Sequence, residues 1–161
     1  MTDTTKYLTS LIEKKINPHR DTRIYYAKEV TFDYSGNAIR IDVVQFKPRN
    51  NSVGGIEQGD FYCYEIKSSV DDFNSKHGHN FIGDYNYYVM PLDVYYSVQN
   101  RIPFGVGVYC PVERIGYTEL QSFRNARRMG RKRAISEILL MMFRSANRDN
   151  IKMMRENEKT L

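Results

Sequence analysis

The sequence has no long run of apolar residues, and this absence excludes a whole class of proteins. A membrane-spanning helix needs roughly 18 or more consecutive apolar residues, and no stretch of this chain approaches that length. Lys6, Glu13, Lys14 and Lys15 also interrupt the N-terminal segment, so we expect no secretory signal peptide. The sequence therefore predicts a cytoplasmic protein without a membrane partner.

Cysteine is scarce, and there is no internal repeat, low-complexity tract or linker that would divide the chain. Cys63 and Cys110 lie in apolar runs without Cys-x-x-Cys spacing, so we expect reduced thiols in a core. With 161 residues, 41% of them hydrophobic and 27% charged, the composition is that of an ordinary globular protein. We expect a single domain over residues 1–161.

Acidic residues are missing between Gln121 and Ser136, where basic residues are densest. From Val112 onward there are 12 Lys+Arg and 6 Asp+Glu, against 12 and 13 in the residues before it. Such a cluster indicates a surface that binds nucleic acid, with a solvated helix face as the alternative. The candidate nucleic-acid-binding residues are Arg124, Arg127, Arg128, Arg131, Lys132 and Arg133.

Hydrophobic periodicity predicts the order of helices and strands. A first helix has Leu8, Leu11, Ile12 and Ile16 on its buried stripe, Asp3 or Thr4 as its cap, and Pro18 after its end. Strands are expected around Val30–Tyr34 and over 40–46, 61–67, 85–90 and 104–110. Helices are expected from Ser69 to about Gly78, over 92–99 and from about Glu119 onward, and residues 47–60 read as a long, polar, mobile loop.

This order favours an α/β fold with a mixed sheet. Three consecutive strands followed by a helical crossover are not typical of a doubly wound parallel sheet. We expect helices to cover the faces of the sheet. The core would span about residues 3–111, with a basic helical extension over about 112–161.

Three charged residues on two expected strands suggest a chemistry. Glu65 and Lys67 lie two apart on one strand and therefore point to the same face. If the loop between the strands is centred near residue 53 or 54, Asp42 falls opposite Glu65 or Ile66. Two carboxylates and the Ile66 carbonyl are hard oxygen ligands that suit Mg²⁺ or Mn²⁺, and Lys67 could orient a water or stabilise a developing anion.

The alternative is a structural ion-pair network at the edge of a strand. Against it, Glu65 lies within the apolar run Phe61–Ile66, where an unpaired carboxylate is expensive.

These residues, in this order of elements, resemble the PD-(D/E)XK nuclease superfamily, which has the restriction-endonuclease-like fold. Arg-Ile-Asp at 40–42, Tyr-Glu-Ile-Lys-Ser-Ser at 64–69, Asp72-Phe73 and the Tyr-rich strand before Pro91 carry the resemblance. They are most similar to small members associated with DNA repair, phages and mobile elements. Ile41 replaces the proline of the superfamily's name. The resemblance implies an α-β-β-β-α-β core.

By this resemblance Asp42 and Glu65 are metal ligands and Lys67 is the catalytic lysine of a metal-dependent DNA endonuclease. Glu29 and, more weakly, Glu13 are candidate further acids, and Lys76 on the following helix is a candidate phosphate contact. The alternatives are a non-catalytic nucleic-acid-binding module with the same fold, and a protein that interacts or dimerises through its C-terminal helices. The residues leave open whether the nucleic acid is duplex, single strand, junction or RNA.

Three further motifs have two interpretations each. His77-Gly78-His79 has the form of a short metal chelate but lacks a third soft ligand, so an ordinary loop is favoured. Tyrosines 85, 87, 88, 95 and 96 could stack on bases, but at strand spacing they are more typical of sheet residues. The apolar stripe from Ile135 to Ala146 is either core or the seam of a homodimer.

Overall fold

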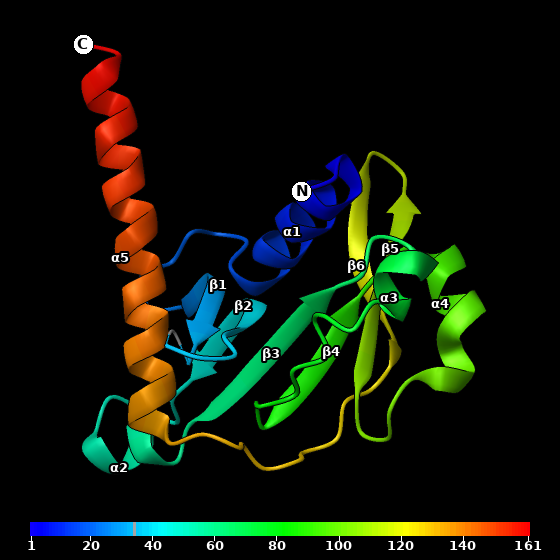
Figure 1. The fold of residues 1–161 in the computed structure, drawn as a ribbon, viewed down its shortest axis with the longest axis horizontal. Helices are drawn as coiled ribbons and strands as arrows, with labels where there is room; N and C mark the ends of the chain where they lie inside the picture. Colours follow the sequence, from blue (N-terminus) through cyan, green and yellow to red (C-terminus); the bar gives the residue numbers. More distant parts are fainter. Residues whose placement is uncertain (34) are drawn as a thin grey trace.

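The structure is a computed structural model that describes residues 1–33 and 35–161. Within these residues the centre of the fold is one mixed sheet of six strands in the order β1-β2-β3-β4-β5-β6 (Figure 1). The strands are β1 (Tyr25–Phe32), β2 (Ile39–Lys47), β3 (Asp60–Ile66), β4 (Tyr85–Val89), β5 (Gly107–Arg114) and β6 (Tyr117–Arg124). The predicted α/β fold with a mixed sheet is confirmed.

The helices in the described residues connect and cover this sheet. They are α1 (Asp3–Ile16), α2 (Val53–Glu57), α3 (Val70–Asn74), α4 (Leu92–Val98), the 3₁₀ turn η1 (Gln99–Arg101) and α5 (Ile135–Lys159). Antiparallel pairing joins β1, β2 and β3, and β5 with β6, whereas β3–β4 and β4–β5 are parallel. Parallel neighbours need a crossover, and the segments containing α3 and α4 supply the two crossovers.

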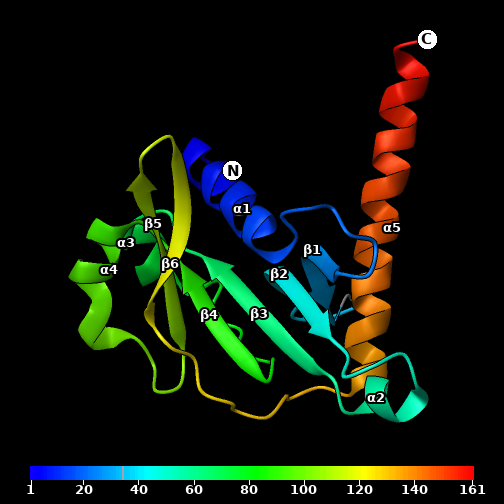
Figure 2. The same ribbon diagram turned by 180° about the vertical axis from the view of Figure 1, so that it is seen from behind.

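The two faces of the sheet are covered by different helices. Because side chains alternate along a strand, the neighbours Val43 and Val44 of β2 point to opposite faces. Val43 belongs to the cluster that contains Leu8 and Ile12 of α1. Val44 belongs to the cluster that contains Ile138 of α5. The helices α3 and α4 cover the β4–β5 part of the sheet through a third cluster. Figure 2 shows α1 lying across the sheet and α5 standing beside β1.

The helix α1 has a different cap from the one predicted. Its N-cap is Thr2, not Asp3 or Thr4, because the Thr2 hydroxyl accepts a hydrogen bond from the Thr5 N–H at 3.1 Å. Its end, before Pro18, is as predicted. Capping depends on local backbone geometry that several neighbouring hydroxyls and carboxylates could have satisfied.

The strand β1 starts at Tyr25, earlier than the predicted Val30. The earlier part was missed because the alternation of buried and exposed side chains is interrupted within the strand. Ala27 and Val30 are both buried in the same cluster although they are three residues apart. Glu29, between them, has a positive φ of 49°, which resets the side-chain alternation. The predicted strand position Tyr34 lies outside the described residues.

The segment 47–60 is not one open loop. It contains the short helix α2, whose N-cap Ser52 accepts a hydrogen bond from the Gly55 N–H at 3.0 Å. The polar residues that suggested a mobile loop therefore form a capped helical turn.

The helix α3 begins where the sequence predicted and ends earlier. The Ser69 hydroxyl accepts a hydrogen bond from the Asp72 N–H at 3.0 Å, so Ser69 is the N-cap. The helix ends at Asn74 rather than near Gly78. The reason lies in the His79 ring, whose Nε2 is within 3.0 Å of two carbonyl oxygens at the end of the helix and takes the place of a further turn.

The C-terminal third departs most from the sequence prediction. The last predicted strand, 104–110, begins later and continues through Pro111 as β5. A proline is tolerated at position 111 because no hydrogen bond from its backbone nitrogen is needed. The backbone groups of Tyr109 point towards β4, and those of Pro111, two residues later, point the same way, where β4 has already ended. The prediction of helix from about Glu119 onward is correct only from Ile135, where the long helix α5 begins. Before it, Tyr117–Arg124 form β6, a sixth strand beyond the core expected to end near residue 111.

The region 112–161 is therefore not a helical extension. It comprises the end of β5, the strand β6, an extended connection over 125–134 and the helix α5. We call residues 124–133 the arginine segment. It crosses one end of the sheet from β6 to α5, as the yellow-to-orange trace in Figure 1 shows. None of the helices in the described part of the chain is long and apolar enough to span a membrane.

Candidate metal and catalytic site

The predicted convergence of Asp42 and Glu65 arises where the ladder between β2 and β3 ends. The antiparallel register includes Val43 opposite Tyr64, so the next residues along, Asp42 and Glu65, lie opposite each other. The Asp42 carboxylate then takes the place of a backbone acceptor, because its Oδ2 accepts a hydrogen bond from the Ile66 N–H at 2.8 Å. The side chain thereby replaces a rung of the sheet.

Glu65 is a buried carboxylate whose hydrogen bonds are incomplete. Its side chain is only 1% exposed. Oε1 accepts a hydrogen bond from the Asn80 N–H at 3.3 Å, whereas Oε2 is buried without a hydrogen-bond partner in the structure. Burial, and then the charge of Asp42, raise the pKa of Glu65 to about 8. Burial also raises the pKa of Asp42, and the bond from Ile66 opposes that shift.

The ammonium group of Lys67 lies on the same side of the site. Lys67 is 2% exposed, and its Nζ donates a hydrogen bond to the His77 carbonyl at 2.6 Å. Gly78, which has a φ of +70°, lies against both charged groups. A Cβ on Gly78 would be 2.7 Å from Lys67 Nζ and 3.3 Å from Glu65 Oε2. The site therefore needs a glycine here, for its backbone conformation and for its lack of a side chain.

The donor set fits a hard divalent cation. In the described residues no group of three or more His, Cys, Asp or Glu side chains could hold a metal, so protein side chains would supply only the two carboxylates. Mg²⁺ commonly binds through one or two carboxylates and keeps several waters. A cation would remove an electrostatic cost at Glu65 Oε2, which has no hydrogen-bond partner and lies next to the half-buried carboxylate of Asp42.

The Ile66 carbonyl is on the correct side to contribute. The N–H and C=O of one strand residue point to the same neighbour in a ladder. Because the Ile66 N–H points to Asp42, its carbonyl also faces the β2 side. This placement is compatible with the predicted third oxygen ligand.

A cleft of about 770 Å³ opens onto these residues. Arg40 and Lys76 line it together with Asp42, Glu65 and Lys67. Lys76 was expected on a helix but lies after the end of α3. The cleft thus brings Asp42 and Glu65 together with three cations, and the acids Glu29 and Asp72 line it as well.

The two further candidate acids are placed differently. Glu29 lines the cleft, and its carboxylate lies 3.7 Å from Arg40 and 3.9 Å from Arg148. Glu13 lies on α1, 3.1 Å from Lys28 and with one oxygen accepting the Tyr26 hydroxyl at 3.2 Å. The structure therefore brings Glu29 to the rim of the site and pairs Glu13 with side chains beside α1.

The six basic residues of the arginine segment contact their own chain. Arg128 lies 2.6 Å from Asp60 and 3.6 Å from Asp84, and Arg131 lies 3.3 Å from Asp84. Arg133 pairs with Asp33 at 2.6 Å and with Glu137 at 3.0 Å. Arg124 donates to the Pro103 carbonyl, Arg127 covers the Phe104 ring, and the Lys132 N–H donates to the Ile82 carbonyl. Nucleic-acid binding by this segment stays a prediction.

The sheet tyrosines stack on one another. Tyr62 stacks on Tyr85 with centroids 4.7 Å apart, and Tyr87 stacks on Tyr109 at 4.9 Å. Cations cover the ends of these stacks, with Lys47 over Tyr62, Arg128 over Tyr85 and Lys15 over Tyr109. Because ring faces already have partners, this arrangement favours the structural interpretation over base stacking.

The motif His77-Gly78-His79 serves the loop in which it lies. His77 offers its carbonyl to Lys67, and His79 Nδ1 lies 2.7 Å from the Tyr88 hydroxyl. With Nε2 at the end of α3, both ring nitrogens of His79 are in use. The loop thereby holds Lys67 and Gly78 in position.

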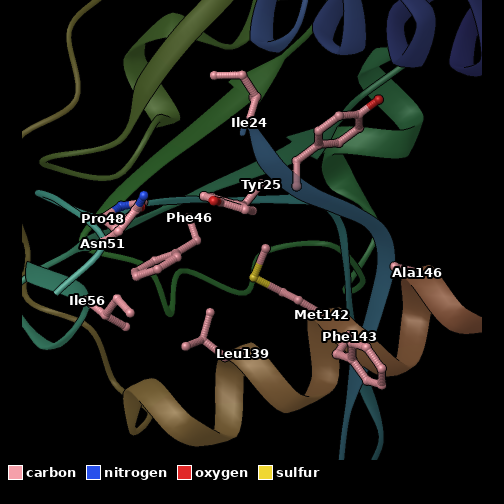
Figure 3. A pocket seen from close by; sticks show the side chains of 11 residues that line it. Ile24, Tyr25, Phe46, Pro48, Asn51, Ile56, Leu139, Met142, Phe143 and Ala146 are labelled. Carbon is pink, nitrogen blue, oxygen red and sulfur yellow. The ribbon is translucent and has the colours of Figure 1, made fainter. Parts of the chain in front are cut away.

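A second concave region, an apolar groove of about 600 Å³, lies at the other end of β1. Figure 3 shows side chains from the start of β1, the β2–α2 region and α5 pointing into it. No group of charged side chains converges there. The groove is lined by Ile24, Tyr25, Tyr26, Phe46, Pro48, Asn51, Ile56, Leu139, Met142, Phe143 and Ala146.

Comparison with known proteins identifies a fold and nothing further. No family model and no curated protein matches the chain. Among solved structures, SPO1766, a protein of unknown function from Silicibacter pomeroyi, superposes with a TM-score of 0.66 at 16% sequence identity. The match covers 98% of this chain and 94% of that protein. At this identity the likeness concerns the fold, so the site must be argued from its own geometry.

Sequence reasoning missed the loop that completes the site. The Asn80 N–H bonds Glu65, and the Asn80 side chain donates to the Arg40 carbonyl at 3.4 Å. No periodicity or motif marks Asn80. Gly78 was the one residue whose type could have indicated this loop. Its position between two histidines suggested a metal chelate instead, so its steric role beside Lys67 was not recognised.

Proposed function

We propose that the chain is a metal-dependent nuclease that hydrolyses phosphodiester bonds of nucleic acid, most directly DNA, at Asp42, Glu65 and Lys67. The observation that carries the proposal is the buried, unpartnered Glu65 Oε2 beside Asp42. The other buried carboxylate oxygen without a hydrogen bond in the described residues, Asp60 Oδ1, lies 2.6 Å from Arg128 and is compensated by that ion pair. Glu65 is the case that needs another explanation, because buried carboxylates in stable cores are usually hydrogen-bonded or paired.

The arrangement of elements supports the proposed restriction-endonuclease-like topology. The order α1-β1-β2-β3-α3-β4 has the form of the α-β-β-β-α-β core that the resemblance implies. Asp42 lies on β2, Glu65 at the end of β3 and Lys67 directly after it. Roles in DNA repair or in phage and mobile-element DNA processing are part of the same proposal.

Each residue has a definable role in the proposed reaction. Asp42, Glu65 and the Ile66 carbonyl would hold Mg²⁺ or Mn²⁺, which would lower the pKa of a bound water and offset negative charge on the phosphate. Lys67, oriented by the His77 carbonyl, would position the attacking water or stabilise the developing anion. Lys76 and Arg40 at the rim would contact neighbouring phosphates.

Substitution of the site residues tests this function. We expect Asp42→Ala or Lys67→Ala to abolish Mg²⁺-dependent cleavage of labelled DNA, a loss of roughly 10³-fold or more, while binding of uncleaved DNA in EDTA persists. Cleavage at the wild-type rate by either variant would refute the assignment.

Metal titration separates an active nuclease from a non-catalytic module. Calorimetric titration of Mn²⁺ or Mg²⁺ should show one saturable site in the wild type that Glu65→Gln removes. A wild type that binds neither metal measurably would favour the non-catalytic module.

A second candidate function, a protein that dimerises or docks through α5, has its own supporting observation. Leu140, Phe143, Ile151 and Met154 lie on the solvent side of α5 and are between 40% and 70% exposed. Phe143 also borders the apolar groove. These residues are spaced by three, eight and three positions, which places them on one side of the helix. Exposed apolar residues on one side of a helix are typical of a helix–helix contact.

Sedimentation equilibrium tests this second candidate. A homodimer predicts a molecular mass of twice 19.0 kDa that a Leu140→Glu/Phe143→Glu double variant converts to the monomer mass. A monomer at all concentrations in the wild type would exclude self-association through this surface.

A further inference from the structure

The helix α5 is longer than its packing against the domain requires. Its last buried residue is Ser145, yet the helix continues to Lys159. Residues 146–161 are exposed, except for partly buried Asp149. At 1.5 Å per residue this free part extends about 20 Å. Figures 1 and 2 both show it standing clear of the sheet with the C-terminus at its tip. Packing against the domain explains only the first half of α5.

The exposed half of α5 carries a row of cations. Five basic residues recur at i, i+4, i+8, i+11 and i+15, which places them on one side of the helix. Their outer surface forms a shallow concavity along the helix. Asp149 and Glu156 line the cleft beside α1, and Glu156 also borders the concavity of the stripe. We call the five residues the α5 stripe: Arg144, Arg148, Lys152, Arg155 and Lys159.

The α5 stripe is continuous with the candidate site. A cleft of about 530 Å³ between α1 and α5 is lined by both Asp42 and Lys152, together with Lys6 and Lys28. Arg148 lies beside the same cleft, because it donates to the Lys28 and Glu29 carbonyls at 3.1 and 3.3 Å. A polyanion lying along the stripe would therefore reach the cleft that contains Asp42, where Lys6, Lys28 and Lys152 lie among the acids Glu13, Glu29, Asp149 and Glu156.

The two basic regions of the chain differ in their partners. In the arginine segment, Arg128, Arg131 and Arg133 are paired with carboxylates of the domain. Arg124 bonds the Pro103 carbonyl and Arg127 lies over the Phe104 ring, so these two guanidinium groups also have partners in the chain. In the stripe, Arg148 pairs with Asp149 at 3.0 Å and lies 3.9 Å from Glu29. The contrast therefore concerns Lys152, Arg155 and Lys159, which are exposed on a helix that projects into solvent. Binding of phosphates releases condensed counterions, and cations already held by acids contribute little to that release.

We propose that the α5 stripe is the surface that holds the sugar–phosphate backbone of a nucleic acid and leads it to the cleft at Asp42. This inference rests on the proposed function for its substrate class, and it replaces the arginine segment as the main electrostatic contact. Because the stripe contacts backbone rather than base edges, binding would carry no sequence preference.

Two triple variants of equal charge test the proposal. The stripe variant is Lys152→Gln/Arg155→Gln/Lys159→Gln, and the segment variant is Arg124→Gln/Arg127→Gln/Lys132→Gln. Glutamine is a good helix former, and far-UV circular dichroism verifies that α5 persists. Affinity for duplex and for single-stranded DNA is measured in EDTA, where no cleavage occurs, over a series of salt concentrations.

We expect the stripe variant to bind at least tenfold more weakly than wild type, with the slope of log K against log salt reduced by about 2 to 3. The segment variant should stay within about threefold of wild type. Whichever of duplex and single strand loses more identifies the substrate form. Unchanged binding by the stripe variant, equal losses in both variants, or a wild type that binds neither DNA would overturn the proposal.

Failure of the nuclease assignment gives a different pattern. If the wild type binds DNA through the stripe but never cleaves with Mg²⁺ or Mn²⁺, the proposed chemistry is wrong and the binding surface stands. If the wild type cleaves and the stripe variant binds and cleaves equally well, the surface is wrong and the chemistry stands.

Discussion

Two buried carboxylates near opposite ends of β3, those of Asp84 and Glu65, differ in how fully the folded chain supplies them with hydrogen-bond and ion-pair partners. Asp84, just before β4, is 2% exposed and has many partners. Its side chain accepts the Phe61 N–H at 2.9 Å and lies within 3.3 and 3.6 Å of Arg131 and Arg128. Glu65, at the other end of β3, is 1% exposed and has one oxygen without a partner.

The difference separates a structural acid from a functional candidate. Asp84 joins the arginine segment to the sheet, and the chain itself supplies the compensating charge. Glu65 is held in place by Asn80 and Gly78 without such compensation. Because its pKa is raised to about 8, Glu65 holds its proton at pH 7 in the metal-free protein, and a bound cation would supply the charge that lets it ionise. A lysine or arginine near an acid in the sequence therefore does not tell a structural carboxylate from a functional one. The distinguishing feature is a buried carboxylate oxygen that no side chain of the folded chain compensates.

The largest expected effect on stability concerns Asp84. Asp84→Ala leaves the Phe61 N–H without its acceptor and removes the only acidic partner of Arg131 in the described residues and one of two from Arg128. We therefore expect a loss of about 3–5 kcal/mol in the free energy of unfolding. Urea denaturation measures it, with exposed Glu57→Ala as a control expected within about 0.5 kcal/mol of wild type. A loss no larger than in the control would make the two buried acids equivalent.

Substitution of Glu65 is expected to raise the stability of the metal-free protein, whereas substitution of Asp84 lowers it. Its folded-state pKa of about 8 lies above the ordinary value of 4.5. Between these values the folded state holds the proton more tightly, so stability falls as pH rises from about 4.5 to 8 and then levels off. Glu65→Gln should therefore stabilise the metal-free protein by roughly 1–3 kcal/mol at pH 7.

Thermal unfolding in EDTA at several pH values provides the measurement. The wild-type Tm should decline across this window more than that of Glu65→Gln. Parallel pH profiles for the two proteins would show that Glu65 carries no uncompensated charge.

A smaller loss of stability is expected when Gly78 is replaced by alanine. Gly78→Ala places a Cβ at 2.7 Å from Lys67 Nζ in a backbone with positive φ, so we expect about 1–2 kcal/mol of destabilisation. Gly116→Ala is the matched control, because Gly116 also has a positive φ but no neighbour within 4 Å. Both should lose similar stability, and only Gly78→Ala should also lose metal-dependent cleavage. Equal activity in the two variants would separate Gly78 from the site.

Several features of the site could be predicted from sequence because they depend on local rules. The period of a strand places Glu65 and Lys67 on one face, and two consecutive strands on one loop pair antiparallel. With the loop centred near residue 53 or 54, these rules place Asp42 opposite Glu65 or Ile66, and the observed ladder runs up to Val43 opposite Tyr64. The mixed sheet followed from the order of elements. The roles of these residues in catalysis stay a proposal.

The C-terminal third could not be predicted in the same way. The residues of β6 have helix-forming neighbours in the sequence. They form a strand because they pair with β5, and not because of their own strand propensity. The partners of the arginine segment, Asp60 and Asp84, are also distant in the chain. The density of charge in a sequence does not report which charges the fold will pair.

The sequence by itself determined a carboxylate–lysine pair on an apolar strand, a second acid opposite it and a basic C-terminal third. Only the tertiary structure decided which basic residues are paired and which carboxylate is left without a partner. Strand alternation and register act between neighbours, so the sequence displays them. Compensation of charge depends on which distant side chains the folded chain brings within a few ångströms, as it does for Asp84 and does not do for Glu65 Oε2.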